Sequence, residues 1–190
     1  MDKHTTSPLL KGAALAGLAL LGMKAYSVAK AATSTLDTIP SLDVPRYMGL
    51  WYEIARYPNR FERKCDGFAT ATYTAQPDGS VKVENRCRRP DGRIELAEAI
   101  AHQAGGPDSP RLKVRFAPAA LSFIPLVWGD YWVIDLDPGY RLAAVSEPGR
   151  DYLWILARTP QVEPAAYEAL LARLAARGFD TGRLVRTRQA

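Results

Sequence analysis

The chain has 190 residues, a formal net charge of +5 and a sequence pI near 9.3. With 47% hydrophobic and 24% charged residues, it is typical of one globular domain with a short extension, and a disordered chain is excluded. The basic excess does not indicate a nucleic-acid-binding protein. The first 31 residues hold four lysines and one acidic residue, so the remainder has a formal charge of only +2.

The first 31 residues predict an export signal. A polar, basic start is followed by an apolar run of 12 residues, Gly12–Met23, and by the small-x-small cleavage site Ala29–Ala31. Because a transmembrane helix needs about 20 apolar residues, residues 1–31 are interpreted as a signal peptide, with an uncleaved N-terminal anchor as the alternative. No cysteine lies near the cleavage site, so a lipid-modified N-terminus is not expected.

Residues 32–41 resemble a polar linker, and residues 42–190 read as one domain of short strands. The turns between the strands carry Pro, Asp and Gly at positions that favour tight reversals, as in Gln76–Gly79 and Asp137–Gly139. The expected strands are Trp51–Tyr57, Phe68–Ala75, Val81–Cys87, Arg93–Gln103, Arg111–Phe116, Tyr131–Leu136, Tyr140–Val145 and Tyr152–Ala157. Such a series predicts an all-β antiparallel sandwich or barrel.

One helix is expected near the C-terminus, between Pro164, which suits a first helical turn, and Gly178, which ends the run. An apolar stripe on one face of this helix predicts that it packs against the outside of the sheet. The stripe consists of Tyr167, Leu170, Leu171 and Leu174. Beyond the helix, Leu184 and Val185 indicate a short final strand.

The two cysteines, Cys65 and Cys87, flank an expected hairpin. In an exported protein such a pair favours a disulfide, with two free thiols or a metal pair as the alternative. One histidine outside the leader, His102, does not complete a zinc site, so neither a metal nor a cofactor is expected. His102 is interpreted as a surface or structural residue.

No catalytic residue is expected, because the sequence contains neither a nucleophile motif nor a phosphate-binding glycine-rich loop. A small basic run, Arg86, Arg88 and Arg89, indicates a solvated face or, alternatively, a contact with anionic lipid.

Two stretches resemble a known family. The run GLWYEIARYPNRFER, which starts at Gly49, and the run YWVIDLDPGYRLAAVSEPGRDYLWILARTP, which starts at Tyr131, are similar to the lipocalins. Within that family they resemble the bacterial outer-membrane lipocalins, apolipoprotein D and the plant temperature-induced lipocalins. The likeness covers roughly residues 44–189.

The resemblance implies an eight-stranded antiparallel up-and-down barrel with one C-terminal helix packed outside. Gly49, Trp51 and Arg158 are then the structural signature, with the Arg158 guanidinium packed on the Trp51 ring at the closed base. The family also implies a carrier of fatty acids or lysophospholipids that serves membrane maintenance under stress. Since the leader lacks the lipoprotein cysteine, we expect an exported, periplasmic protein, with association with the outer membrane as the alternative.

Strand alternation suggests which residues line the lumen. Trp51, Glu53, Ala55 and Tyr57 share a face of the first strand, and Glu53 is either a polar ligand contact or the partner of an internal arginine. In the sixth strand either Tyr131 and Val133 or Trp132 and Ile134 face inward. Weaker candidates in the last strand are Leu153, Ile155 and Ala157.

The segment Ala117–Trp128 is unusually apolar for a loop. It either folds over the barrel opening or forms a lip that touches a membrane, with Leu121, Phe123, Ile124 and Leu126 as the contacting residues. Two further functions stay open at this point, because the fold tolerates many ligands. One is an isomerase on the same fold, and the other is a binder of tetrapyrroles or other pigments. The oligomeric state is not predicted.

Overall fold

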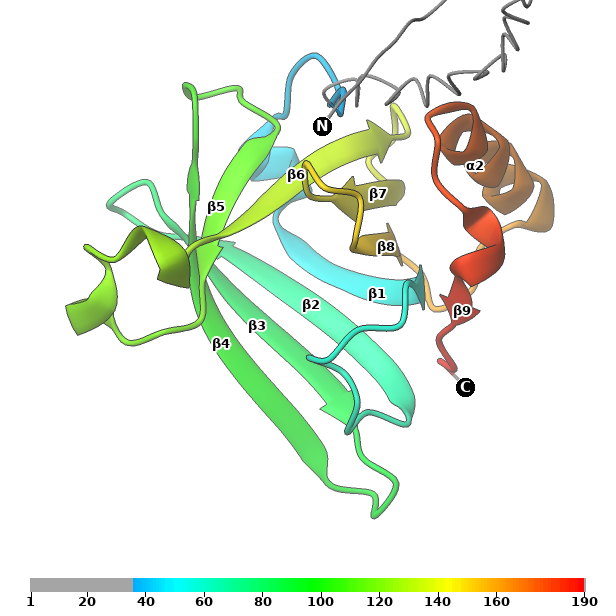
Figure 1. The fold of residues 1–190 in the computed structure, drawn as a ribbon, viewed down its shortest axis with the longest axis horizontal. Coiled ribbons are helices and arrows are strands. Elements are labelled where there is room, and N and C mark those ends of the chain that lie inside the picture. The colour runs from blue at the N-terminus through cyan, green and yellow to red at the C-terminus, as the bar shows by residue number, and fades with distance from the viewer. Residues whose placement is uncertain (1–35, 190) are drawn as a thin grey trace, which may run out of the picture. The chain divides into compact units, whose positions relative to one another are not determined.

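The computed structural model describes residues 36–189 (Figure 1). The expected signal peptide, residues 1–31, lies outside the described residues. Within them, no helix has the length and apolar character needed to cross a membrane.

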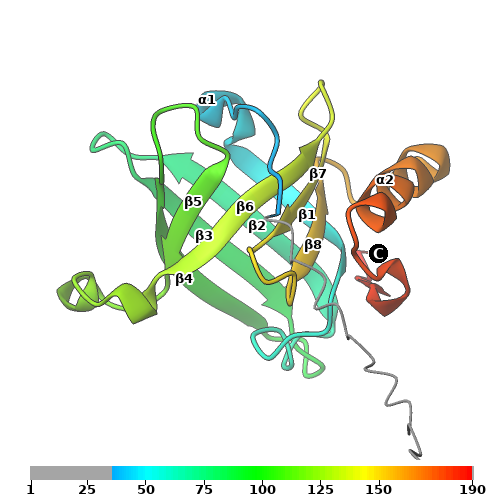
Figure 2. The same ribbon diagram turned by 45° about the horizontal axis from the view of Figure 1, so that its top comes forward.

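Eight strands follow one another as an antiparallel meander, and the first strand pairs with both the second and the eighth. The strands are β1 (Gly49–Arg56), β2 (Gly67–Ala75), β3 (Val81–Arg88), β4 (Ile94–Gln103), β5 (Arg111–Arg115), β6 (Gly129–Leu136), β7 (Leu142–Ser146) and β8 (Leu153–Ala157). The predicted eight-stranded barrel is therefore confirmed (Figure 2). A barrel of this size has room for side chains or for one small ligand.

A ninth strand, β9 (Val185–Arg186), pairs with the end of β1 that does not reach β2. β1 pairs with β2 only from Gly49 to Tyr52. Beyond that point the backbone N–H of Phe68 in β2 donates to the Arg188 carbonyl, and the Gln189 side-chain amide donates to the carbonyls of Glu53 and Ala69 at 2.7 Å each. The C-terminal segment thus closes the barrel wall between β1 and β2.

The helix α2 (Pro164–Ala176) lies outside the barrel against β7, β8 and β1 (Figure 2). Its first turn is capped by the Glu163 carboxylate, which accepts from the Ala166 N–H at 2.8 Å. Tyr167, Leu170 and Leu174 of the predicted apolar stripe are buried. The helix therefore covers the outer face of this half of the barrel, as the sequence pattern predicts.

Two apolar clusters lie on the two sides of the wall. The inner cluster includes Trp51, Tyr73, Val83, Ala99, Leu112, Val133, Ala143, Val145 and Leu156. The outer cluster, which contains the buried residues of α2, includes Ile54, Ala55, Tyr57, Ile134, Leu142, Ala144, Leu153, Ile155 and Ala157. Because neighbouring residues of β7 and β8 alternate between the clusters, these two strands are buried on both faces.

One end of the barrel is closed by the short helix α1 (Val44–Tyr47), whose N-terminus is capped by the Asp43 carboxylate. Beside it, the Arg158 guanidinium lies 4.0 Å from the centre of the Trp51 ring. Gly49 adopts φ +95°, and a Cβ there would lie 3.4 Å from the Arg158 guanidinium, which favours glycine at this position. Part of the expected linker also belongs to the domain, since Leu36 is buried in the outer cluster.

Candidate ligand-binding site

Small side chains line the interior over the middle of the barrel. Val83 of β3 faces Ala99 of β4, and one step further toward the other end Asn85 faces Ala97. Val83 and Ala99 are buried, whereas Ala97 is exposed and Asn85 half-buried, although strand alternation places all four on the inner face. Solvent therefore reaches the interior from the end where β1 stops and β2 starts, which we call the open end.

Three tyrosine hydroxyls meet near the closed end. The Tyr131 hydroxyl lies 2.9 Å from the hydroxyls of both Tyr47 and Tyr73. The Tyr47 ring also packs on Trp51, with ring centres 4.7 Å apart. We call Tyr47, Tyr73 and Tyr131 the tyrosine cluster; it forms the floor of the interior.

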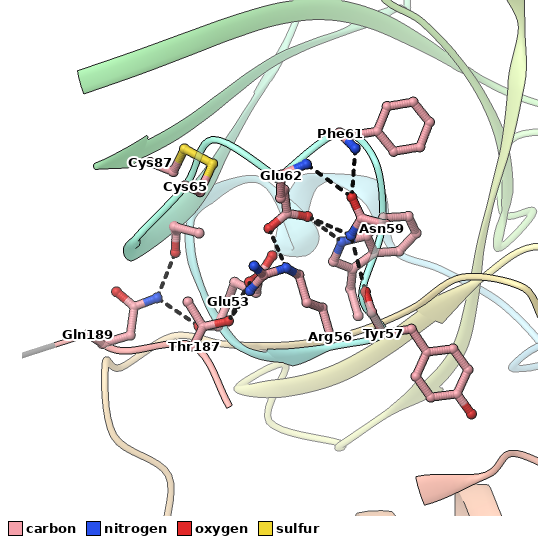
Figure 3. Close-up of polar contacts among 12 residues, drawn as sticks. Glu53, Arg56, Tyr57, Asn59, Phe61, Glu62, Cys65, Cys87, Thr187 and Gln189 are labelled. Atoms are coloured by element: carbon pink, nitrogen blue, oxygen red, sulfur yellow. Dashed lines mark hydrogen bonds and ion pairs between the residues drawn. A yellow bond between two sulfur atoms is a disulfide. The ribbon is translucent and has the colours of Figure 1, made fainter. Parts of the chain in front are cut away.

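Charged side chains gather at the opposite end, where the β1–β2 loop folds back over the barrel (Figure 3). One guanidinium nitrogen of Arg56, Nη1, donates to Glu53 at 2.9 Å, and another, Nε, lies 3.0 Å from Glu62. The indole N–H of Trp154 and the side-chain amide of Asn59 donate to Glu62 at 2.9 and 3.1 Å. We call these five residues the mouth cluster.

Glu53 is only 5% exposed, and Thr187 of the C-terminal segment donates a hydrogen bond to its carboxylate. Burial, followed by the nearby Glu62 carboxylate, raises the pKa of Glu53 from 4.5 to about 8, although Arg56 opposes the shift. Burial and the neighbouring carboxylate therefore favour a state in which Glu53 holds a proton at neutral pH. Of the two roles considered for Glu53, the structure shows the internal pair with an arginine.

The predicted lining residues divide between the two sides of the wall. Tyr131 and Val133 belong to the inner cluster, which resolves the open choice in the sixth strand against Trp132 and Ile134. The prediction is wrong for five others, which pack with α2 in the outer cluster: Ala55, Tyr57, Leu153, Ile155 and Ala157. Figure 3 shows the Tyr57 ring pointing away from the mouth cluster.

A β-bulge explains the error in the first strand. The register between β1 and β8 shifts between Glu53 and Ala55, so one extra residue inverts the alternation. Arg56 then faces inward in place of Ala55 or Tyr57. In β8 no bulge is involved: Trp154 and Leu156 face the interior, and the predicted set is the one that meets the helix.

The fold and the sequence are similar to those of known proteins. Residues 42–189 match the lipocalin-like domain family. The chain is 41% identical over 157 residues to temperature-induced lipocalin-1 of Arabidopsis thaliana (82% of this chain, 83% of that one) and 39% identical over 155 residues to the outer membrane lipoprotein Blc of Escherichia coli K12 (81% and 83%). The chain belongs to the lipocalin family.

Among solved structures, the cockroach allergen Per a 4 superposes on this lipocalin with a TM-score of 0.62 at 17% identity, over 82% of this chain and 92% of that one. This likeness supports the fold alone. Together with the family, the barrel makes the protein a binder of a small hydrophobic ligand. The relatives reported above carry names of lipocalins and lipoproteins, and neither is named as an enzyme.

The signature of this lipocalin lies where the resemblance implies. Arg158 donates to the carbonyls of Leu50, Arg46 and Tyr140 at 2.9, 2.9 and 3.2 Å while it stacks on Trp51. Every nitrogen of the guanidinium therefore has a partner. Its role is to seal the closed end.

The predicted disulfide is present between Cys65 and Cys87. It attaches the loop that carries Glu62 to the end of β3, next to the mouth cluster (Figure 3). A disulfide is typical of proteins outside the cytoplasm, which agrees with the outer-membrane lipoproteins among the relatives.

The apolar segment between β5 and β6 extends away from the barrel and forms two short 3-10 turns, Ala119–Leu121 and Pro125–Val127 (Figure 1). Leu126 is 95% exposed and Phe123 79% exposed. Leu121 is also exposed, and Ile124 is half-buried. The segment therefore does not bury its largest apolar side chains over the opening.

The basic run pairs with acidic neighbours on the barrel surface. Arg86 lies 3.5 Å from Glu84, and Arg89 lies 3.1 Å from Glu95. Arg88 lies 3.6 Å from Asp66. His102, at the closed end of β4, packs against the Trp128 ring with ring centres 5.6 Å apart.

Several site residues were missed by the sequence interpretation: Arg56, Glu62, Trp154, Tyr47 and Tyr73. Glu62 belongs to a loop whose return over the barrel leaves no periodic signal. Tyr73 alternates with small residues in β2, Ala69 and Ala71, and this pattern was a usable signal for an inner face.

Proposed function

We propose that this lipocalin stores or transports fatty acids or lysophospholipids for maintenance of the cell-envelope membranes under stress. The observation that carries the proposal is the inner wall, which is small and apolar between an aromatic floor and a charged mouth. An acyl chain fits the wall, and a polar head group fits the mouth. Tyr131 and Val133 are the proposed lining residues. At the mouth, Glu53 positions the Arg56 side chain, which faces the interior.

The energetics favour an acyl ligand of moderate affinity. Burying a chain of about 12 methylene groups contributes roughly 10 kcal/mol at about 0.8 kcal/mol per group. Association costs offset about 4 kcal/mol or more of this amount. The remainder corresponds to a micromolar or weaker dissociation constant, which suits a carrier that must release its ligand.

The exposed segment between β5 and β6 is the proposed contact with a membrane. Leu121, Phe123, Ile124 and Leu126 form its apolar side chains, and no charged residue interrupts residues 117–129. A basic loop, residues 60–64, lies at the same open end and exposes 63% of Phe61. Exposed apolar and basic side chains at one end of a molecule together favour binding to an anionic bilayer surface. We propose that the lipid is exchanged through this end. The proposed location is the periplasm, after export directed by the signal peptide at residues 1–31.

The experiment that tests the carrier is extraction of the purified protein with organic solvent followed by mass spectrometry. A fatty acid or lysophospholipid near one per barrel supports it. An absorbing pigment in place of a lipid would contradict it.

The membrane contact is tested by flotation with vesicles that contain anionic phospholipid. The double variant Phe123→Ser/Leu126→Ser should lose vesicle binding and keep its affinity for fatty acid. Leu50→Ser is the matched control, because Leu50 is a 42% exposed leucine at the closed end. Equal flotation of the wild type and the double variant would contradict the membrane contact.

A further inference from the structure

The hydroxyl groups of the tyrosine cluster do not satisfy one another completely. Each of Tyr47, Tyr73 and Tyr131 has one O–H donor. Burial raises the pKa of all three phenols, that of Tyr73 to about 12, so each carries its proton at neutral pH. The two contacts between them, Tyr47 to Tyr131 and Tyr73 to Tyr131, use two protons. One O–H group is left without an acceptor within residues 36–189.

An unmatched O–H donor in a buried position is costly, because its hydration is lost and no hydrogen bond replaces it. Tyr47 and Tyr73 are 3% and 7% exposed, and Tyr131 is half-buried. Tyr131 touches both partners and is the most accessible of the three. The spare donor is therefore available to an acceptor that arrives from inside the barrel.

The geometry of the interior determines which part of a ligand reaches the cluster. Tyr73 pairs with Val83 across the strands, the mouth cluster lies at the open end, and Asn85 and Ala97 lie one pairing step nearer to that end. A linear molecule that enters through the open end therefore brings its leading end to the phenols. A hydrocarbon end there would leave the spare donor unpaired.

We propose that the tyrosine cluster is a binding site for a neutral oxygen, a hydroxyl or a carbonyl, at the buried end of a long-chain ligand. This proposal rests on the lipid-carrier function and adds the end group that the cavity selects. A carboxylate fits less well, because a buried charge requires several donors or a free cation. The cluster supplies one donor, and all the nitrogens of the nearby Arg158 already donate to carbonyls.

The test compares hexadecanoic acid with 16-hydroxyhexadecanoic acid, which differ only by a hydroxyl at the far end of the chain. Displacement of a fluorescent fatty acid gives both dissociation constants at one pH, and the measured quantity is their ratio. We expect the preference for the hydroxylated acid to fall about 3- to 10-fold, the effect of one hydrogen bond, in the triple variant Tyr47→Phe/Tyr73→Phe/Tyr131→Phe, which removes every O–H donor of the cluster. The affinity for hexadecanoic acid should change by less than about 2-fold, because the three rings are kept.

Two further variants make the test decisive. Tyr73→Phe leaves two hydroxyls and one contact, and hence still one spare donor, so it should keep the preference. A loss of the preference in this variant would contradict the count of donors, even if the triple variant does not fold. Tyr52→Phe is the matched control, because Tyr52 packs on the outer cluster and should leave the ratio unchanged.

The outcomes separate this proposal from the carrier function. An unchanged ratio in the triple variant, with both acids still bound, would overturn the hydroxyl-binding site and leave the carrier intact. A folded wild-type protein that binds neither acid would overturn both.

Discussion

The two ends of this barrel hold their buried polar groups in different ways. At the closed end the groups are neutral phenols and a guanidinium that stacks on Trp51 and donates to backbone carbonyls. At the open end two carboxylates, from a strand and a loop, surround Arg56, and a hydroxyl of the C-terminal segment donates to one of them. The protonation of the closed end is therefore constant near neutral pH. The stability of the open end, in contrast, depends on pH and on the structure of the β1–β2 loop.

The largest effect is expected at the closed end. Trp51→Ala leaves a cavity beneath Arg158 and removes a side chain that is fully buried, so we expect a loss of about 3–5 kcal/mol in the free energy of unfolding. Urea denaturation followed by tryptophan fluorescence or circular dichroism measures it. A loss below 1 kcal/mol would show that the closed end is not the stable part of the barrel.

Removing the disulfide acts on the open end. Cys65→Ser/Cys87→Ser should lower the free energy of unfolding by about 2–4 kcal/mol, because the unfolded chain is no longer constrained over 22 residues. Because the bond attaches the loop locally, we also expect hydrogen exchange to accelerate more in residues 58–66 than in β7. Equal acceleration in both regions would contradict a local role for the bond.

The pH dependence separates the two ends most directly. The proton on Glu53 is bound more tightly in the folded protein, with a pKa of about 8 against 4.5, so its stabilising contribution is complete below pH 4.5 and is lost as the pH rises to 8. The variant Glu53→Gln should gain stability relative to the wild type over this interval, by roughly 1–3 kcal/mol. Urea midpoints at pH 5 and pH 8.5 measure the difference.

Glu98→Gln is the control for this titration. Glu98 lies on the outer surface, and its hydrogen bond with Lys82 lowers the pKa of its carboxyl. Its contribution is therefore present above pH 4.5 and is lost as the pH falls, which is the opposite sign. If both variants shift the same way with pH, the assignment of the proton to the mouth cluster is incorrect.

The smallest effect is expected at the C-terminal segment. Gln189→Ala removes two hydrogen bonds of 2.7 Å, to the carbonyls of Glu53 and Ala69, and should cost about 1–2 kcal/mol. Arg183→Ala is a control from the same segment, since it removes only the contact of a guanidinium with the Tyr57 ring. An equal loss in both variants would argue against a specific role of Gln189 in the wall.

The sequence predicts the strands well because their boundaries depend on local chemistry. Turns such as Gln76–Gly79 require Pro and Gly, and the helix boundaries depend on Pro164 and Gly178. The inner face is harder to predict. A bulge after Glu53 depends on pairing with β8, and no residue near it signals the change. In β8 both faces are apolar, since one meets α2 and the other meets the interior, so alternation alone does not distinguish Leu153 from Trp154.

The mouth cluster is still less predictable from sequence. Glu53, Glu62 and Trp154 come from β1, the β1–β2 loop and β8, and they meet, with Thr187 beside them, only because that loop and the C-terminal segment return to the same end of the barrel. A charged residue within an expected strand, as at Glu53, identifies an unusual position without identifying its partners.

The burial of β7 on both faces has a consequence for dynamics. All five residues, Leu142–Ser146, are buried, with the interior on one side and α2 on the other, whereas Ile94 and Leu96 of β4 are exposed on its outer face. The half of the wall that contains β7 is therefore rigid, and the half that contains β4 is flexible. Amide protons of β7 should exchange only when the whole molecule unfolds, while those of β4 report local opening. A ligand wider than the interior of the ligand-free barrel would be accommodated by movement of the half that contains β4.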